Sequence, residues 1–172
     1  GENSKAEILK HSPAGKVPVL VDGDLHVWDS LAILEYLAER EPRVWPADAK
    51  LRARARSISA EMHAGFQSLR QHMSMNIRRR HPGKGRTPES LADVRRVLEI
   101  WSECRGPFLF GPFCGADAMY APVATRLRTY DVALGAKGAA YVRHVLAWPD
   151  LVEWTREAVA EPEEIAELEV EF

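Results

Sequence analysis

The stretch Gly15-Lys16-Val17-Pro18-Val19-Leu20, followed by Asp29-Ser30, decides the fold of this 172-residue chain. The run that begins at Lys16 is short and rich in β-branched residues, and Leu25 to Trp28 forms a second short run. Asp22-Gly23-Asp24 lies between them and has the composition of a tight turn. Two such runs joined by a glycine-containing turn predict a β-hairpin.

A helix is predicted directly after the hairpin, over residues 30–39. Asp29 and Ser30 stand at its start, where their side-chain oxygens can accept hydrogen bonds from the free backbone N–H groups of the first turn. The apolar residues that follow fall on one helical face, namely Leu31, Leu34, Leu37 and Ala38.

The best linker candidate is Glu41-Pro42-Arg43-Val44-Trp45-Pro46, because its two prolines interrupt the helical pattern. We therefore divide the chain into an N-terminal part at residues 1–41, a linker at residues 42–46 and a C-terminal domain at residues 47–172.

Helical patterns fill the C-terminal domain. The segment from Ala47 to Arg80 lacks proline and is predicted to be one long amphipathic helix. Thr87-Pro88-Glu89 has the cap, proline and acid that open a second helix. Further helices are predicted near residues 116–128, 137–146 and 150–160. The acidic tail, residues 161–172, is expected to be a solvated, frayed end.

Composition restricts the class of function. The formal net charge is −2 and the sequence pI is about 6.3, so no global basic field points to a nucleic-acid partner. Cys104 and Cys114 form no CxxC pair and lack metal-ligand spacing, which argues against a disulfide framework and a zinc site. The apolar runs are too short to span a bilayer. We expect a cytoplasmic protein without metal, membrane or nucleic-acid partners.

The order of the first run, the hairpin and the Asp29-Ser30 pair resembles the glutathione S-transferase family, in its bacterial cytosolic type. The resemblance extends from about Lys5 to Glu161. It implies an α/β plus all-α fold, in which an incomplete thioredoxin-like N-terminal domain precedes an all-helical C-terminal domain. In the family the Val-Pro bond is cis, so the resemblance marks Pro18 as a structural cis-proline.

The resemblance also assigns a glutathione-binding set. Val17 is expected to pair through its backbone with the cysteinyl unit of glutathione, as a strand adds to a sheet edge. Asp29 and Ser30 match the pair that holds the γ-glutamyl end, and Lys16 matches the basic residue that meets the glycyl carboxylate. Taken singly, each feature also fits an ordinary edge-strand proline or an ordinary helix cap.

A second family mark lies at residues 113–119, which resemble the buried capping box of the family's helical domain. Cys114 stands where the family has Ser or Thr, and a thiol is a poorer acceptor than a hydroxyl. Asp117 is expected to keep a structural capping role. A reactive Cys114 at a helix start is an alternative, against which a small buried residue is the favoured interpretation.

By resemblance, the second-substrate pocket would include Met62, His63, Met75 and Arg78. Methionines suit a promiscuous apolar site. The alternative is that Met62 belongs to the core at helical spacing and that His63 is a surface residue.

The family's first strand, first helix and second strand, with the Tyr, Ser or Cys that activates the glutathione thiol, are expected before Lys5. Ser4 and Ser12 are interpreted as loop residues, so no catalytic residue is assigned and the sequence is interpreted as an incomplete record. The resemblance implies a homodimeric transferase that transfers, or uses, the glutathione thiolate on a small electrophilic substrate in detoxification, so that the substrate is joined to glutathione, isomerised or reduced. A non-catalytic scaffold or dimerisation domain is the alternative, and a glutathione-dependent disulfide reductase would need an upstream Cys.

Overall fold

The computed structural model describes residues 2–162. It contains the predicted hairpin. Strands β1 (Val19–Asp22) and β2 (Leu25–Trp28) pair antiparallel, with Val19 opposite Trp28 and Asp22 opposite Leu25. Gly23 has a φ of 64° in the turn, a conformation that glycine adopts without a steric penalty. The acidic tail predicted for residues 161–172 lies outside the described residues from position 163 onward.

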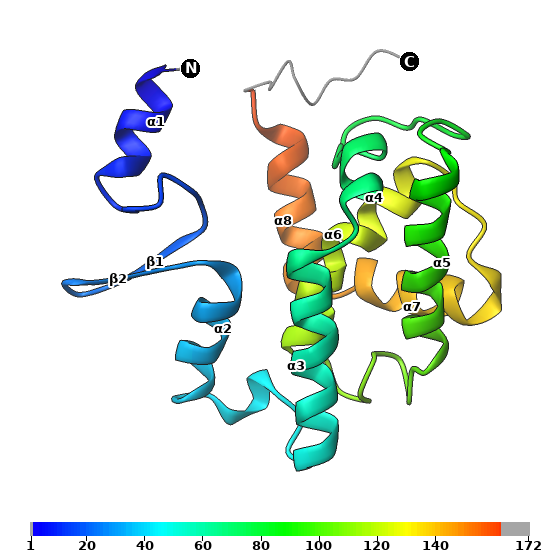
Figure 1. Cartoon of the computed structure of the whole chain (residues 1–172), viewed down its shortest axis with the longest axis horizontal. Coiled ribbons are helices and arrows are strands. Elements are labelled where there is room, and N and C mark those ends of the chain that lie inside the picture. The colour runs from blue at the N-terminus through cyan, green and yellow to red at the C-terminus, as the bar shows by residue number, and fades with distance from the viewer. Residues whose placement is uncertain (1, 163–172) are drawn as a thin grey trace.

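Two helices flank the hairpin (Figure 1): α1 (Glu2–Leu9) precedes it, and α2 (Ser30–Ala38) follows where the sequence predicts a helix. Tyr36 and Arg40 hold the end of α2 on the turn, since each donates a 2.6 Å hydrogen bond to the Asp22 carboxylate. The loop expected at Ser4 is wrong, because Ser4 lies within α1. The hydrophobic spacing of that helix is too weak to show in the sequence.

The linker is an ordered turn. A short 3₁₀ helix, η1 (Pro42–Val44), forms there because the Glu41 side chain accepts the Arg43 N–H at 3.1 Å. Trp45 follows with only 4% of its surface exposed and packs into the core of the helical domain. This buried anchor fixes the linker against the helices that come after it.

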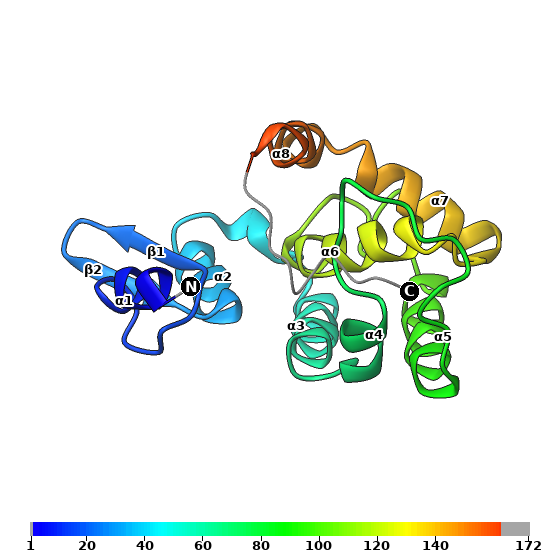
Figure 2. The same cartoon turned by 90° about the horizontal axis from the view of Figure 1, so that it is seen from above.

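The remaining helices form the C-terminal domain: α3 (Ala49–Ala64), α4 (Gln67–His72), α5 (Pro88–Ser102), α6 (Gly115–Thr129), α7 (Gly135–Leu146) and α8 (Pro149–Ala160). Figure 2 shows α6 in the middle of this domain, between α3 and α4 on one side and α7 and α8 on the other. Aromatic residues fill the centre, where Trp101 and Tyr141 have ring centroids 4.7 Å apart. None of the helices within residues 2–162 has the length and apolarity needed to cross a membrane.

The single helix predicted from Ala47 to Arg80 is wrong, because the chain breaks after α3 and again after α4. Gly65 ends α3, and a Cβ at that position would lie 2.7 Å from the Glu61 carbonyl oxygen. Phe66 then takes a left-handed conformation with a φ of 58°. The Asp93 side chain of α5 accepts the Leu69 N–H of the new helix at 2.9 Å. A hydrogen bond from a helix distant in the sequence therefore stabilises the break between α3 and α4. Local periodicity does not reveal such a contact.

After α4 the chain runs as a loop across the end of α6. The Asn76 side-chain oxygen accepts the backbone N–H groups of Arg78 and Arg79 at 3.1 and 3.0 Å, which forms a turn in place of a helix. Thr129 donates its hydroxyl to the Asn76 carbonyl at 2.7 Å. These bonds hold the loop on α6, and they explain why the basic run at residues 78–80 does not end a helix.

Candidate functional site

The segment before β1 presents its backbone outward at Val17. The Val17–Pro18 peptide bond is cis, and Val17 is 70% exposed. In the described part of the chain, neither the N–H nor the C=O of Val17 has a hydrogen-bond partner. The neighbouring Lys16 is exposed, and its N–H donates to the hydroxyl of the buried Ser12 at 3.4 Å. An unpaired amide and an exposed cation therefore stand side by side at this edge.

Asp29 and Ser30 stand at the other end of the hairpin, at the start of α2. One oxygen of the Asp29 carboxylate accepts the N–H of Leu31 at 2.9 Å and that of Ala32 at 3.4 Å. Asp29 has a φ of 76°, which is costly for a residue with a side chain and marks a position held by its surroundings. Ser30 is the first helical residue, where the helix dipole favours a bound carboxylate.

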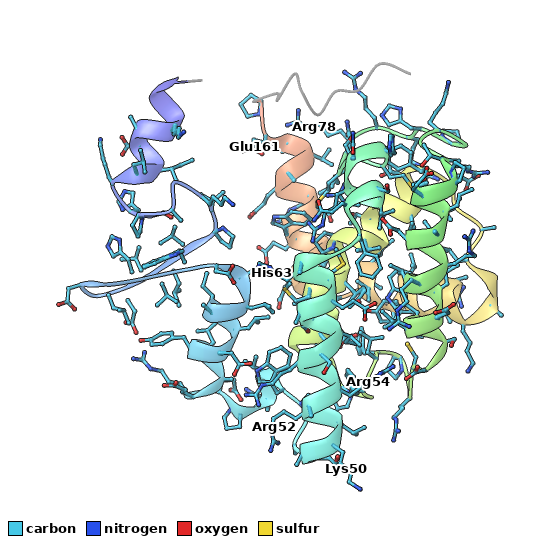
Figure 3. The ribbon with its side chains drawn as sticks, viewed as in Figure 1. Lys50, Arg52, Arg54, His63, Arg78 and Glu161 are labelled. Carbon is cyan, nitrogen blue, oxygen red and sulfur yellow. The ribbon has the colours of Figure 1, made fainter. Side chains whose placement is uncertain are left out.

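His63 in the last turn of α3 contacts both members of this pair. Its Nε2 lies 3.0 Å from the second carboxylate oxygen of Asp29, and its Nδ1 lies 3.5 Å from the Ser30 hydroxyl. Figure 3 shows His63 on the side of α3 that faces the N-terminal part. The helical domain thus contributes a residue to this edge. The residues that the sequence predicts for the edge all lie in the hairpin region. Because 33 positions separate His63 from Ser30, no sequence motif joins them.

The other residues predicted for a second-substrate pocket have different surroundings. Met62 is buried in the core with 4% exposure, while Met75 is half-buried. Arg78 is exposed and reaches the end of α8, where it donates to the carbonyl oxygens of Ala158 at 3.2 Å and of Glu161 (Figure 3). Of the four, His63 is the one in contact with the Asp29-Ser30 pair.

The two thiols lie away from this edge, and both are poor nucleophiles. Burial raises the pKa of Cys114 to about 12 and that of Cys104 to about 11, and the Asp117 charge adds to both shifts. Cys114 caps α6, and the fully buried Asp117 accepts the N–H groups of Leu109 and Cys114 at 3.0 Å each. Tyr141 donates its hydroxyl to the same carboxylate at 3.1 Å. Asp117 therefore joins two helices and a loop in the core.

A cavity of about 1080 Å³ lies at the linker, not at the hairpin edge. Its walls include Leu34 of α2, Trp45, Phe113 at the start of α6, and Trp148 before α8. Neither Lys16 nor Ser30 lines it. The exposed Val17 backbone, the Lys16 cation and the start of α2 lie at the hairpin edge, so we take that edge as the candidate site.

Comparison with known proteins points to glutathione S-transferases. The sequence model described as "Glutathione S-transferase, N-terminal domain" matches residues 1–40. A probable glutathione S-transferase of Oryza sativa subsp. japonica is 26% identical over 177 residues, covering 94% of this chain and 76% of that protein. A probable maleylacetoacetate isomerase of Caenorhabditis elegans is 44% identical over 71 residues, covering 40% of this chain and 33% of that protein.

Solved structures share the fold. A glutathione transferase homologue from Burkholderia, with bound glutathione, has a TM-score of 0.68 at 24% identity and covers 88% of this chain and 77% of its own. Human glutathione S-transferase T1-1, in its apo form, has a TM-score of 0.61 at 26% identity and covers 89% of this chain and 72% of its own.

A small α/β part with the thioredoxin-like arrangement, followed by an all-helical domain, is the fold that these proteins define. Residues 1–40 match the N-terminal domain model of the glutathione S-transferase family, and the chain as a whole is similar in fold to solved members of that family. The match to the Caenorhabditis elegans isomerase spans 33% of that relative, and a match to a glutathione S-transferase of Arabidopsis thaliana spans 44%, less than half of either protein.

Proposed function

We propose that the chain binds reduced glutathione along the edge formed by Lys16, Val17, Asp29 and Ser30, and that the protein uses the glutathione thiolate on a small electrophilic substrate. The observation that carries the proposal is the exposed Val17 backbone, without a partner in the described residues, beside a cation and opposite a helix N-terminus.

Each unit of glutathione has a complementary group at this edge. The γ-glutamyl carboxylate suits the N-terminus of α2 at Ser30, and the γ-glutamyl ammonium suits the Asp29 carboxylate. The cysteinyl backbone suits the amide and carbonyl of Val17, in the manner of an added strand. The glycyl carboxylate suits the Lys16 ammonium. Each charged group of glutathione would thus meet a group of opposite charge, or a helix N-terminus, at this edge.

The chemistry we propose is the attack of the glutathione thiolate on an electrophilic carbon. A carbon–sulfur bond forms, and either a leaving group departs with its electron pair or the adduct takes up a proton. The high pKa values of Cys104 and Cys114 argue against a nucleophile from this chain, so glutathione supplies the sulfur. No residue of this chain is proposed to activate the thiol.

Isothermal titration calorimetry with reduced glutathione tests the binding step. Lys16→Ala should raise the Kd several-fold through loss of an exposed charge contact, and Ser30→Ala should raise it by about tenfold through loss of a hydrogen bond to a charged group. Lys50→Ala and Ser57→Ala are matched controls. Figure 3 shows Lys50 at the end of α3 away from His63, and Ser57 donates its hydroxyl within α3. An absence of binding heat, or equal effects of test and control variants, would contradict the proposal.

A second candidate function is dimerisation without catalysis, favoured by exposed apolar residues on the hairpin. Val21, Leu25 and Trp28 are 52%, 45% and 43% exposed, on a two-stranded ladder with two open edges. Sedimentation velocity should then show a homodimer that Leu25→Lys dissociates. A monomer at micromolar concentration would remove this candidate, and glutathione binding without conjugation would favour it.

A further inference from the structure

His63 joins the two residues that are proposed to hold the γ-glutamyl end of glutathione. Its Nε2 lies 3.0 Å from Oδ2 of Asp29, and its Nδ1 lies 3.5 Å from the hydroxyl oxygen of Ser30. Both ring nitrogens are therefore engaged, although the side chains of His63 and Asp29 are only partly buried, with 39% and 42% exposed. Any change in the hydrogen bonding of Ser30 or Asp29 thus reaches the protons of His63.

The donor and acceptor roles without a ligand follow from the chemistry of the three groups. A carboxylate only accepts, so the Nε2 atom that faces Asp29 carries a hydrogen. In a neutral imidazole the other nitrogen is then an acceptor. Nδ1 of neutral His63 accordingly accepts the single hydrogen of the Ser30 hydroxyl. At 3.5 Å this bond is long and weak, so the hydroxyl can turn to another acceptor at little cost.

A bound γ-glutamyl carboxylate changes these roles. It also only accepts, and the Ser30 hydroxyl has one hydrogen to donate. If that hydrogen goes to the ligand, the lone pairs of Nδ1 and of the Ser30 oxygen face each other. A proton on Nδ1 removes this conflict, because an imidazolium donates from both nitrogens. The serine oxygen then accepts from His63 while its hydrogen binds the ligand.

The charges around His63 permit this proton. The ammonium and the carboxylate of the γ-glutamyl unit add no net charge, so an imidazolium keeps Asp29 as its counter-charge. Arg70 of α4 opposes protonation, since it donates to the Met62 and Gly65 carbonyls on either side of His63. Two other charged groups, on helices that pack against α3, have partners of their own: Glu35 of α2 with Arg56, and Arg126 of α6 with the Met73 carbonyl.

We propose that Ser30 and His63 couple the binding of glutathione to the uptake of a proton: the γ-glutamyl carboxylate takes the hydroxyl hydrogen bond of Ser30, and Nδ1 of His63 gains one proton from the solvent. His63 is a positioning residue in this step, because it acts on the ligand through Ser30. The inference rests on the proposed function, since it concerns the same edge. It makes the affinity for glutathione depend on pH through a residue of the helical domain.

Calorimetry of the full chain with S-methylglutathione measures the proton uptake, because this ligand has no thiol that could release a proton of its own. The binding heat is recorded at neutral pH in buffers that differ in enthalpy of ionisation, and its slope against that enthalpy gives the number of protons taken up. We expect a net uptake. Because the complex then holds more protons than the free chain, the Kd should rise by about three- to tenfold between about pH 6 and about pH 8.

The outcomes separate the inference from the function on which it rests. A binding heat that is the same in all buffers, or a Kd that does not rise with pH, would overturn the inference and leave the proposed function in place. An absence of binding heat would contradict the proposed function, and the inference with it.

Three variants assign the proton. His63→Gln should abolish the uptake, since its amide keeps a donor for Asp29 and takes up no proton. Ser30→Ala should bind more weakly and lose most of the uptake, because the link between ligand and His63 is gone. His72→Gln is the matched control, a half-buried histidine at the end of α4, and should keep the uptake. Uptake that persists in His63→Gln or Ser30→Ala, or that His72→Gln removes equally, would overturn the inference.

Discussion

His63 binds Asp29 across the two parts of the chain, with its Nε2 atom 3.0 Å from Oδ2 of the carboxylate. The other oxygen of Asp29 caps the first turn of α2. One carboxylate therefore caps the start of α2 and contacts His63 at the end of α3, which couples the position of the proposed glutathione edge to the helical domain.

His63→Ala should weaken glutathione binding by about three- to tenfold, because the edge loses the contact that holds Asp29 in its strained conformation. His63 is a positioning residue in this prediction. Calorimetry should show the change in Kd, and His63→Gln, which retains a donor, should recover part of the affinity.

His72→Ala provides the control for this change, since His72 is a half-buried histidine at the end of α4. It should leave the Kd for glutathione unchanged. A normal affinity in His63→Ala would show that the first turn of α2 holds Asp29 without help.

The two cysteines should resist thiol reagents in the native protein. With pKa values raised to about 12 for Cys114 and about 11 for Cys104, the thiolate fraction falls about tenfold for each unit of pKa. Reaction with Ellman's reagent should be at least about 100-fold slower than in denaturant, where both thiols react. A rapid native reaction of one equivalent would show that a thiol is accessible and activated.

Local signals in the sequence predict the hairpin and α2, because turn and cap residues such as Gly23 and Asp29 act on their immediate neighbours. The break after Gly65 escapes such reasoning, since it depends on Asp93 of α5 capping a new helix. The contact of His63 with Asp29 escapes it for the same reason. Side chains that meet only after the helices pack leave no periodic signal. The glutathione edge itself is a prediction from the resemblance to a family and not from periodicity.

The ion pair between Glu61 of α3 and Arg96 of α5 should make stability depend on pH. Hydrogen bonds from Arg96 lower the pKa of Glu61 below its usual 4.5. A lowered folded pKa means that the stabilisation is complete above the unfolded pKa and is lost as the pH falls through the folded value. Because both side chains are more than one-third exposed, we expect less than about 1 kcal/mol.

Urea unfolding near neutral pH and at about pH 3 measures this term. Glu61→Gln should lower the free energy of unfolding at neutral pH and reduce the difference between the two conditions. Glu157→Gln, at an exposed position of α8, should change neither. An unaltered pH dependence in Glu61→Gln would assign the acid sensitivity to other carboxylates.

Gly83 and Gly85 form a matched pair for the loop that follows α4. Both have positive φ angles, 79° and 68°, so alanine at either position should cost about 1 kcal/mol for the left-handed backbone alone. A Cβ at Gly83 meets nothing within 4 Å, whereas a Cβ at Gly85 would lie 2.1 Å from the His72 carbonyl oxygen. Gly85→Ala should therefore destabilise by about 3 kcal/mol or more, because backbone must move.

The movement would displace the end of α4, where the Met73 carbonyl accepts from Arg126. Denaturant unfolding measures the destabilisation in each variant. Equal destabilisation by the two variants would show that the loop adapts to the clash, and the end of α4 would then not depend on the close approach of Gly85.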